Sequence, residues 1–182
     1  MNLDVLAPGW IVIALLALLT AAAIEDAARL RISNLISIAV LLLAFVAIAI
    51  AGPQAALWQN LLVFAILLTV GTFLFGLGKL GGGDVKLLAA TALWFPLAGA
   101  LRFVLAVMIA GGVLALIVLA LRWFSWSDGA QQRFVILRRK AGIPYGVAIA
   151  AGAALAILFA QDPGERRPAS PLSNWDLARP AQ

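Results

Sequence analysis

The feature that most constrains this chain is a series of six apolar runs, most of which approach the length that a helix needs to cross a bilayer. Roughly 20 helical residues span a hydrocarbon core. None of the runs alternates with the period of two that a barrel strand would show, so helices must satisfy the backbone in lipid. The sequence therefore predicts an all-α polytopic membrane protein with six transmembrane helices. The runs are Gly9 to Ile24, Leu35 to Ala51, Leu57 to Phe75, Val85 to Phe95, Leu97 to Leu121 and Pro144 to Ala160.

The composition excludes several classes of protein. Hydrophobic residues make up 64% of the chain, far more than a soluble domain of 182 residues can bury. The chain contains no Cys and no His, which excludes disulfides, metal sites that use these ligands, and Ser-His-Asp or Cys nucleophile chemistry. We expect no metal and no cofactor. Any proton transfer must come from Asp, Glu, Lys, Tyr or Ser.

The basic residues predict the topology of the chain. If all six runs cross the membrane, the three loops after the first, third and fifth runs lie on one side, and they hold 9 of the 13 Lys and Arg residues. Basic loops stay on the cytoplasmic side. This distribution favours six crossings, including the short fourth run, with the N-terminus outside. The basic residues are not interleaved with aromatics, so we expect no nucleic acid partner.

The two ends of the chain need separate interpretations. The first run resembles a cleavable signal peptide at its small-residue end, but no Lys or Arg precedes it, so we expect it to remain as a membrane helix. Residues 161–182 are rich in Pro, Arg, Ser and Ala and predict a disordered tail. Residues 1–160 are expected to form one transmembrane domain.

Two aspartates are placed to meet on one face of the membrane. Asp26 ends the first run and Asp84 begins the fourth, so both lie at the same side whatever the orientation. Two close carboxylates share a proton, and one then activates a water while the other protonates a substrate carbonyl. Ionisable groups at the ends of membrane segments are candidates for function. The pair predicts an aspartic catalytic site.

The glycines before Asp84 permit two interpretations. Gly81, Gly82 and Gly83 lack a Cβ, so a substrate backbone can approach Asp84 closely. Alternatively, the stretch is only a helix start with Asp84 as its N-cap. Asp26 likewise has a structural alternative as an interfacial anchor, and for Glu25 this is the preferred interpretation. Lys86 does not share a helical face with Asp84 but lies close in sequence.

Three segments resemble a known family, the type IV prepilin peptidases. The stretch IEDAARLRISN resembles its first aspartate motif, with Asp26 followed by Arg31, Ile32, Ser33 and Asn34. The stretch GGGDVK resembles its GxGD motif followed by Lys, here Gly81, Gly83, Asp84 and Lys86. The segment Pro144, Tyr145 and Gly146 resembles a third motif near the start of the last helix. The resemblance covers about residues 10 to 160, and Ser33 stands where many members have Pro.

The resemblance implies a membrane-embedded aspartic endopeptidase of the bacterial inner membrane. Such enzymes remove the basic leader from prepilins at the cytoplasmic face, next to the hydrophobic helix of the pilin. Asp26 and Asp84 match the catalytic positions, and Gly81, Gly82, Gly83 and Lys86 are expected to bind the substrate. The short chain is similar to the peptidases of Flp-type, or tight adherence, pili. Larger members carry a Cys-rich domain and methylate their product; this chain has no Cys, so we do not expect that second activity.

Two other classes of membrane protein fit the same residues. In a small proton-coupled transporter, Asp26 and Asp84 would relay protons, although paired broken helices are not evident. In a non-catalytic membrane subunit of a pilus or secretion system, substitution of Asp84 would leave assembly intact. A presenilin-like peptidase that cuts inside the hydrophobic helix is a variant of the main interpretation. Neither the oligomeric state nor the identity of the general base follows from the sequence.

Overall fold

The computed structural model describes residues 2–52, 56–123 and 142–160. Within these ranges the ordered elements are all helices, so the predicted all-α class is confirmed. The predicted tail, residues 161–182, and most of the basic fifth loop, residues 124–141, lie outside the described residues. The helices are α1 (Leu3–Leu6), α2 (Gly9–Arg29), α3 (Asn34–Ala51), α4 (Leu57–Gly76), α5 (Gly82–Ala92), α6 (Leu97–Trp123) and α8 (Tyr145–Ala160).

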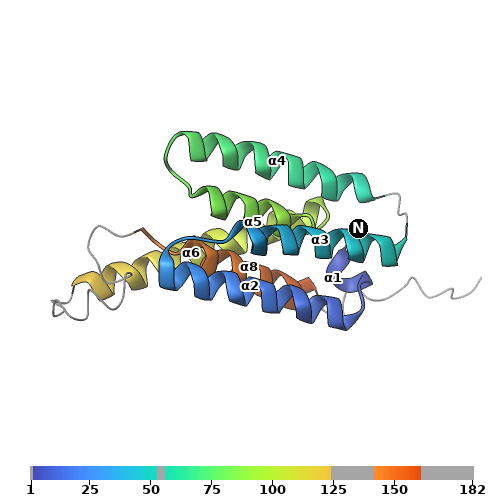
Figure 1. Ribbon diagram of the computed structural model, residues 1–182, viewed down its shortest axis with the longest axis horizontal. Coiled ribbons are helices and arrows are strands. Elements are labelled where there is room, and N and C mark those ends of the chain that lie inside the picture. The colour runs from blue at the N-terminus through green and yellow to red at the C-terminus, as the bar shows by residue number, and fades with distance from the viewer. Residues whose placement is uncertain (1, 53–55, 124–141, 161–182) are drawn as a thin grey trace, which may run out of the picture.

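The helices alternate in direction along the bundle (Figure 1). One end of the bundle, on the left in Figure 1, therefore holds two connections and two helix ends. These are the α2–α3 connection (residues 30–33), the α4–α5 connection (residues 77–81), the last turn of α6 and the start of α8. This end carries Arg29, Arg31, Lys79, Lys86 and Arg122, five of the six basic residues within the described ranges. We call it the basic end. Its charge agrees with the topology expected from the sequence.

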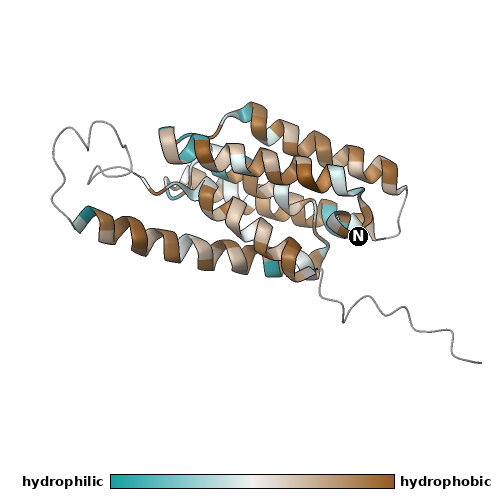
Figure 2. Ribbon diagram, turned by 90° about the horizontal axis from the view of Figure 1, so that it is seen from below, coloured by the Kyte–Doolittle hydropathy of each residue, from teal (hydrophilic) through white to brown (hydrophobic). Residues whose placement is uncertain are grey.

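Four helices, α2, α3, α4 and α6, are long and apolar enough to cross a membrane, and α8 is a shorter apolar helix. Figure 2 shows hydrophobic residues along the lengths of the helices and hydrophilic residues mainly near their ends. The protein is therefore a multi-pass membrane protein. The fourth of the six predicted runs corresponds to α5, which has 11 residues, covers only about 16 Å and is not among these four helices.

The short helix α5 is completed by buried chain beyond its end. Leu93, Trp94 and Phe95 are at most 1% exposed. The Asn60 side chain donates a hydrogen bond of 2.9 Å to the carbonyl of Leu93, and the amide of Leu3 donates one of 3.1 Å to the carbonyl of Trp94. These bonds satisfy backbone carbonyls that the helix end would otherwise leave unpaired in an apolar interior.

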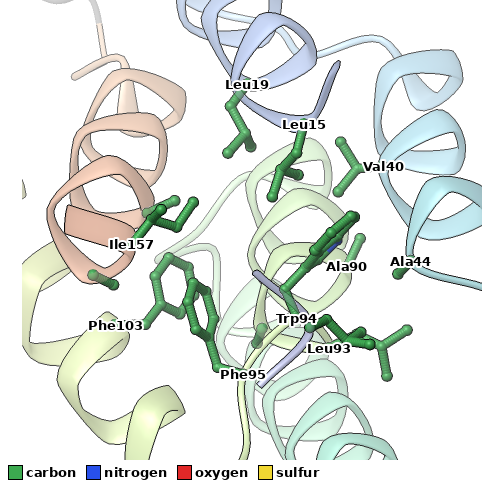
Figure 3. Packing of buried hydrophobic residues seen from close by; sticks show 14 of the residues in the cluster. Leu15, Leu19, Val40, Ala44, Ala90, Leu93, Trp94, Phe95, Phe103 and Ile157 are labelled. Atoms are coloured by element: carbon green, nitrogen blue, oxygen red, sulfur yellow. The ribbon is translucent and has the colours of Figure 1, made fainter. Parts of the chain in front are cut away.

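The core surrounds this segment. Figure 3 shows Trp94 near Leu15 of α2 and Val40 of α3, while Phe95 lies on the side of Phe103 and α8. The rings of Phe95 and Phe103 stack with centroids 5.2 Å apart. Burial of such large aromatic side chains contributes strongly to packing energy. The core therefore fixes the position of α5, and with it the position of Asp84 in the first turn of that helix.

Candidate active site

Asp26 lies in the last turn of α2 and is only 4% exposed. The helix ends at Arg29, and the C-cap residue Leu30 adopts a left-handed conformation with φ of 53° and donates its amide to the carbonyl of Asp26 at 2.7 Å. A left-handed residue at this position is a common way to end a helix, although glycine usually occupies it. The turn directs residues 30–33 back across the end of α2, next to the Asp26 carboxylate.

Glu25 holds this connection in place. Its Oε2 accepts a hydrogen bond of 3.0 Å from the amide of Ser33, and its Oε1 lies 3.9 Å from the guanidinium of Arg29. The Ser33 hydroxyl in turn accepts a bond from the amide of Leu35 and caps α3. The sequence alone indicates only an interfacial role for Glu25, and the bond to Ser33 is a further role that the structure shows. A polar residue eight positions before a helix cap gives no local signal of this contact.

Asp84 is the third residue of α5, and Gly81 is its N-cap. The carboxylate of Asp84 accepts a hydrogen bond from the Gly81 amide. An acidic side chain at this position often reaches back to the N-cap amide. The alternative in which Asp84 is itself the N-cap is therefore wrong, because Gly81 occupies the N-cap position. The Asp84 carboxylate still helps to cap the helix through its bond to the Gly81 amide.

The glycines of this loop allow close packing. A Cβ on Gly83 would lie 3.1 Å from both the Cβ and the carbonyl oxygen of Ile32. A side chain at Gly83 would therefore push the start of α5 away from residues 30–33. Gly81 is exposed, and Gly82 is half-buried beside the ring of Phe75. Close helix packing thus explains Gly83, whereas at Gly81 a Cβ would lie 2.7 Å from Oδ2 of Asp84 itself.

The two aspartates line one cavity of about 200 Å³ at the basic end. Its other walls come from the α2–α3 connection and the glycine loop. The sequence prediction that Asp26 and Asp84 lie at the same end of the bundle is realised in this geometry. The lining residues are Asp26, Leu30, Arg31, Ile32, Gly81, Gly82, Gly83 and Asp84.

Gly146, at the start of α8, completes the surroundings of Asp26. Its amide donates a buried hydrogen bond of 2.6 Å to Oδ2 of Asp26. A Cβ at Gly146 would lie 3.0 Å from that oxygen and 2.9 Å from Cδ1 of Ile32. The segment with Pro144 and Gly146 was noted in the sequence only as a resemblance. The structure shows that it orients the carboxylate of Asp26.

Asp84 lies outside the four helices that are long enough to cross the membrane. Burial raises the pKa of its carboxyl group to about 6, the negative charge of Asp26 raises the pKa as well, and the bond from the Gly81 amide lowers it. A carboxyl group with such a pKa is able to hold or release a proton near neutral pH.

Lys86 bonds to Asn34 and not to either of the two aspartates. Its Nζ donates a hydrogen bond of 2.9 Å to Oδ1 of Asn34, at the start of α3. Lys86 does not line the cavity that holds the two aspartates. The segment that follows Asp26 and the segment that contains Asp84 therefore meet at two places. One is the contact between Ile32 and Gly83, and the other is the bond between Asn34 and Lys86 on the α3 side of α5.

Comparison with curated proteins and with solved structures found no match to this chain. Comparison with protein families found one that matches residues 13–116, more than half of the chain, including both aspartates and the glycine loop. The matched residues contain α3, α4 and α5 entirely and most of α2 and α6. The chain therefore belongs to the type IV leader peptidase family.

Proposed function

We propose that this protein is a membrane-embedded aspartic endopeptidase that removes the leader peptide from Flp-like type IV prepilins. The observation that carries the proposal is the shared cavity of Asp26 and Asp84, two carboxylates from segments 58 positions apart in the sequence. Membership of a leader peptidase family supports the reaction class. Two carboxylates in one partly buried cavity are the groups that acid–base hydrolysis of a peptide bond requires.

The reaction starts with one carboxyl group of the pair ionised and the other protonated. The ionised group takes a proton from a water molecule, and the resulting hydroxide attacks the carbonyl carbon of the scissile bond. The protonated group gives its proton to the carbonyl oxygen, which forms a tetrahedral diol. Collapse of the diol then breaks the C–N bond, with proton transfer to the leaving amine. The Gly146 and Gly81 amides keep the two carboxylates oriented through these steps.

The substrate backbone is proposed to pass over the exposed Gly81 and the neighbouring Gly82. Both residues line the cavity, and the lack of a Cβ there lets a peptide bond approach Asp84. Gly83 contributes by bringing α5 against Ile32. Lys86 is proposed to bind an acidic side chain of the prepilin, because within residues 2–52, 56–123 and 142–160 it bonds to the neutral amide of Asn34 and to no carboxylate.

The active site is proposed to face the cytoplasm, in the inner membrane of a bacterium. The cavity lies at the basic end of the bundle, and basic loops remain in the cytoplasm. The partners are then the prepilin, with its hydrophobic helix in the membrane, and the surrounding lipid. Residues 1–160 form the peptidase domain in this proposal.

The test is cleavage of a co-expressed Flp-type prepilin by wild-type protein, Asp26→Asn and Asp84→Asn. Asparagine keeps the size of the side chain and removes the acid. We expect wild type to shorten the prepilin and each variant to leave it uncut while still inserting in the membrane. Normal cleavage by both variants would overturn the proposal, and proton flux in liposomes would then test the transporter alternative.

A further inference from the structure

A second concave surface, distinct from the aspartate cavity, lies between α3, α4 and α5, which are neighbours in Figure 1. It has a volume of about 290 Å³ and mostly apolar walls. Ile38 is 50% exposed, so the groove opens to the outside of the bundle. We call it the α3–α5 groove. It is lined by Asn34, Ser37, Ile38, Leu41, Phe64, Leu68, Lys86 and Ala90.

One polar group in this groove has no partner. Ser37 is 4% exposed, and its hydroxyl makes no hydrogen bond within the described part of the chain. The hydroxyls of Thr20 and Thr72, by contrast, bond to the carbonyl four residues earlier. The equivalent carbonyl for Ser37, that of Ser33, already accepts the amides of Ile36 and Ser37. A buried hydroxyl without a partner costs free energy, so a ligand that supplies one is favoured.

The polar end of the groove carries a positive charge. Lys86 and Asn34 lie at the basic end, where Lys86 bonds to a neutral amide and to no carboxylate among the residues described. Beyond them, the wall from Asn34 to Leu41 continues for seven residues, or about 10 Å of helix. The groove thus suits an apolar segment of about two helical turns that has an acidic group near its polar end.

The groove is continuous in sequence with the aspartate cavity. Ile32 lines the cavity and Asn34 lines the groove, and in the same way Asp84 lines the cavity and Lys86 the groove. A polypeptide that leaves the cavity therefore reaches the groove within a short distance. The backbone of such a polypeptide can supply a hydrogen-bond partner to the Ser37 hydroxyl, which the hydrocarbon part of a lipid chain cannot do.

From these observations, and resting on the proposed function, we infer that the α3–α5 groove binds the start of the hydrophobic segment of the prepilin. Ser37 bonds to its backbone, Lys86 pairs with its acidic side chain, and Ile38 and Leu41 contact its apolar side chains. The groove thereby sets which peptide bond is presented to Asp26 and Asp84.

The test uses disulfide cross-linking, for which the chain offers a clean background because it contains no Cys. Ile38→Cys is introduced together with Asp84→Asn, which retains uncut substrate. The matched control is Leu119→Cys, since Leu119 is 65% exposed and lies four residues from the basic end of α6. Each Cys variant, in the Asp84→Asn background, is oxidised together with a Flp-type prepilin that carries one Cys in the first two turns of its hydrophobic segment.

We expect a cross-link from Ile38→Cys at least tenfold stronger than that from Leu119→Cys. Equal cross-linking at the two positions would overturn the inference. No cross-link at Ile38→Cys with a prepilin that wild type cleaves would also overturn it, and would indicate that lipid occupies the groove. Cross-linking at Ile38→Cys with a prepilin that wild type does not cut supports the groove and counts against the proposed peptidase. The two proposals are thus separated.

A kinetic measurement supplements the cross-link. Ser37→Ala in the active protein removes one hydrogen bond, so we expect the KM for prepilin to rise roughly two- to tenfold with little change in kcat. An unchanged KM would contradict the role of Ser37. A fall in kcat alone would also contradict it, because the groove binds substrate away from the reacting atoms.

Discussion

The amide of Gly146 donates a hydrogen bond of 2.6 Å to Oδ2 of Asp26, between residues 120 positions apart in the sequence. Through this bond the last helix, α8, orients a carboxylate of the second, α2. Space at Gly146 is limited, because a Cβ there would lie 3.0 Å from the same oxygen. The geometry of Asp26 therefore depends on a glycine outside the two aspartate-bearing segments.

We expect Gly146→Ala to lower prepilin cleavage by at least tenfold, because the added methyl group displaces the carboxylate of Asp26 or the side chain of Ile32. The matched control is Gly142→Ala, since a Cβ at Gly142 meets nothing within 4 Å. Initial rates of both variants in proteoliposomes check this prediction. Equal rates for Gly146→Ala and Gly142→Ala would contradict it.

A second prediction concerns the contact between α5 and the α2–α3 connection. Gly83→Ala places a methyl group 3.1 Å from the Ile32 backbone carbonyl, which cannot rotate away as a flexible side chain can. We expect a large loss of cleavage, with a smaller loss of thermal stability. Gly76→Ala, in the last residue of α4, meets nothing within 4 Å and serves as the control with near-normal cleavage. Unimpaired cleavage by Gly83→Ala would refute this role.

The raised pKa of Asp84 predicts a pH-dependent stability. The folded protein holds a proton on Asp84 up to about pH 6, whereas an ordinary aspartate releases it near 3.8. Between these values the folded state binds more protons than the unfolded state, so this carboxyl group makes stability fall as pH rises. The destabilisation is absent below the lower pKa and complete above the higher one.

Asp84→Asn removes this titration and keeps a group that accepts the Gly81 amide. We therefore expect the Tm of Asp84→Asn to exceed that of wild type by an amount that grows from about pH 4 to about pH 6 and is then constant. Thermal unfolding in detergent across this range measures the difference. A Tm difference independent of pH would show that the carboxyl group of Asp84 is not desolvated.

A fourth prediction addresses the buried end of α5. Asn60 is fully buried and donates to the carbonyl of Leu93, so Asn60→Leu leaves that carbonyl without its partner. We expect a loss of roughly 1–3 kcal/mol in unfolding free energy. Gln59→Leu, at the adjacent and less buried position, is the control. If the two substitutions lower the Tm equally, the bond to Leu93 does not support the end of α5.

Much of the fold follows from the sequence because lipid imposes helices on apolar runs. Five of the six predicted runs agree with the observed helices within a few residues, apart from the extension of α2 to Arg29. The fourth run begins and ends later than α5, because the glycines from Gly82 onward are helical and Leu93–Phe95 are buried non-helical chain. Periodicity alone does not distinguish such a buried segment from a helix.

The cavity was predictable in part. The positions of Asp26 and Asp84 at matching ends of the bundle followed from counting crossings. The bonds from Glu25 to Ser33 and from Gly146 to Asp26 did not, because each depends on the path of a connection or on the packing of α8. Ser37 gave no sequence signal either, since a serine in a membrane helix usually bonds to its own backbone.

The central claim is that Asp26 and Asp84 act as one catalytic unit, and the most direct test compares single and double substitutions. Groups that act together show non-additive losses. Cleavage rates are measured for purified Asp26→Asn, Asp84→Asn and the double variant in proteoliposomes with one prepilin. We expect each single variant to lose at least about a thousandfold in rate and the double variant to be no slower than either one. Losses that multiply in the double variant, or a single variant with near wild-type rate, would contradict the shared role of the two aspartates.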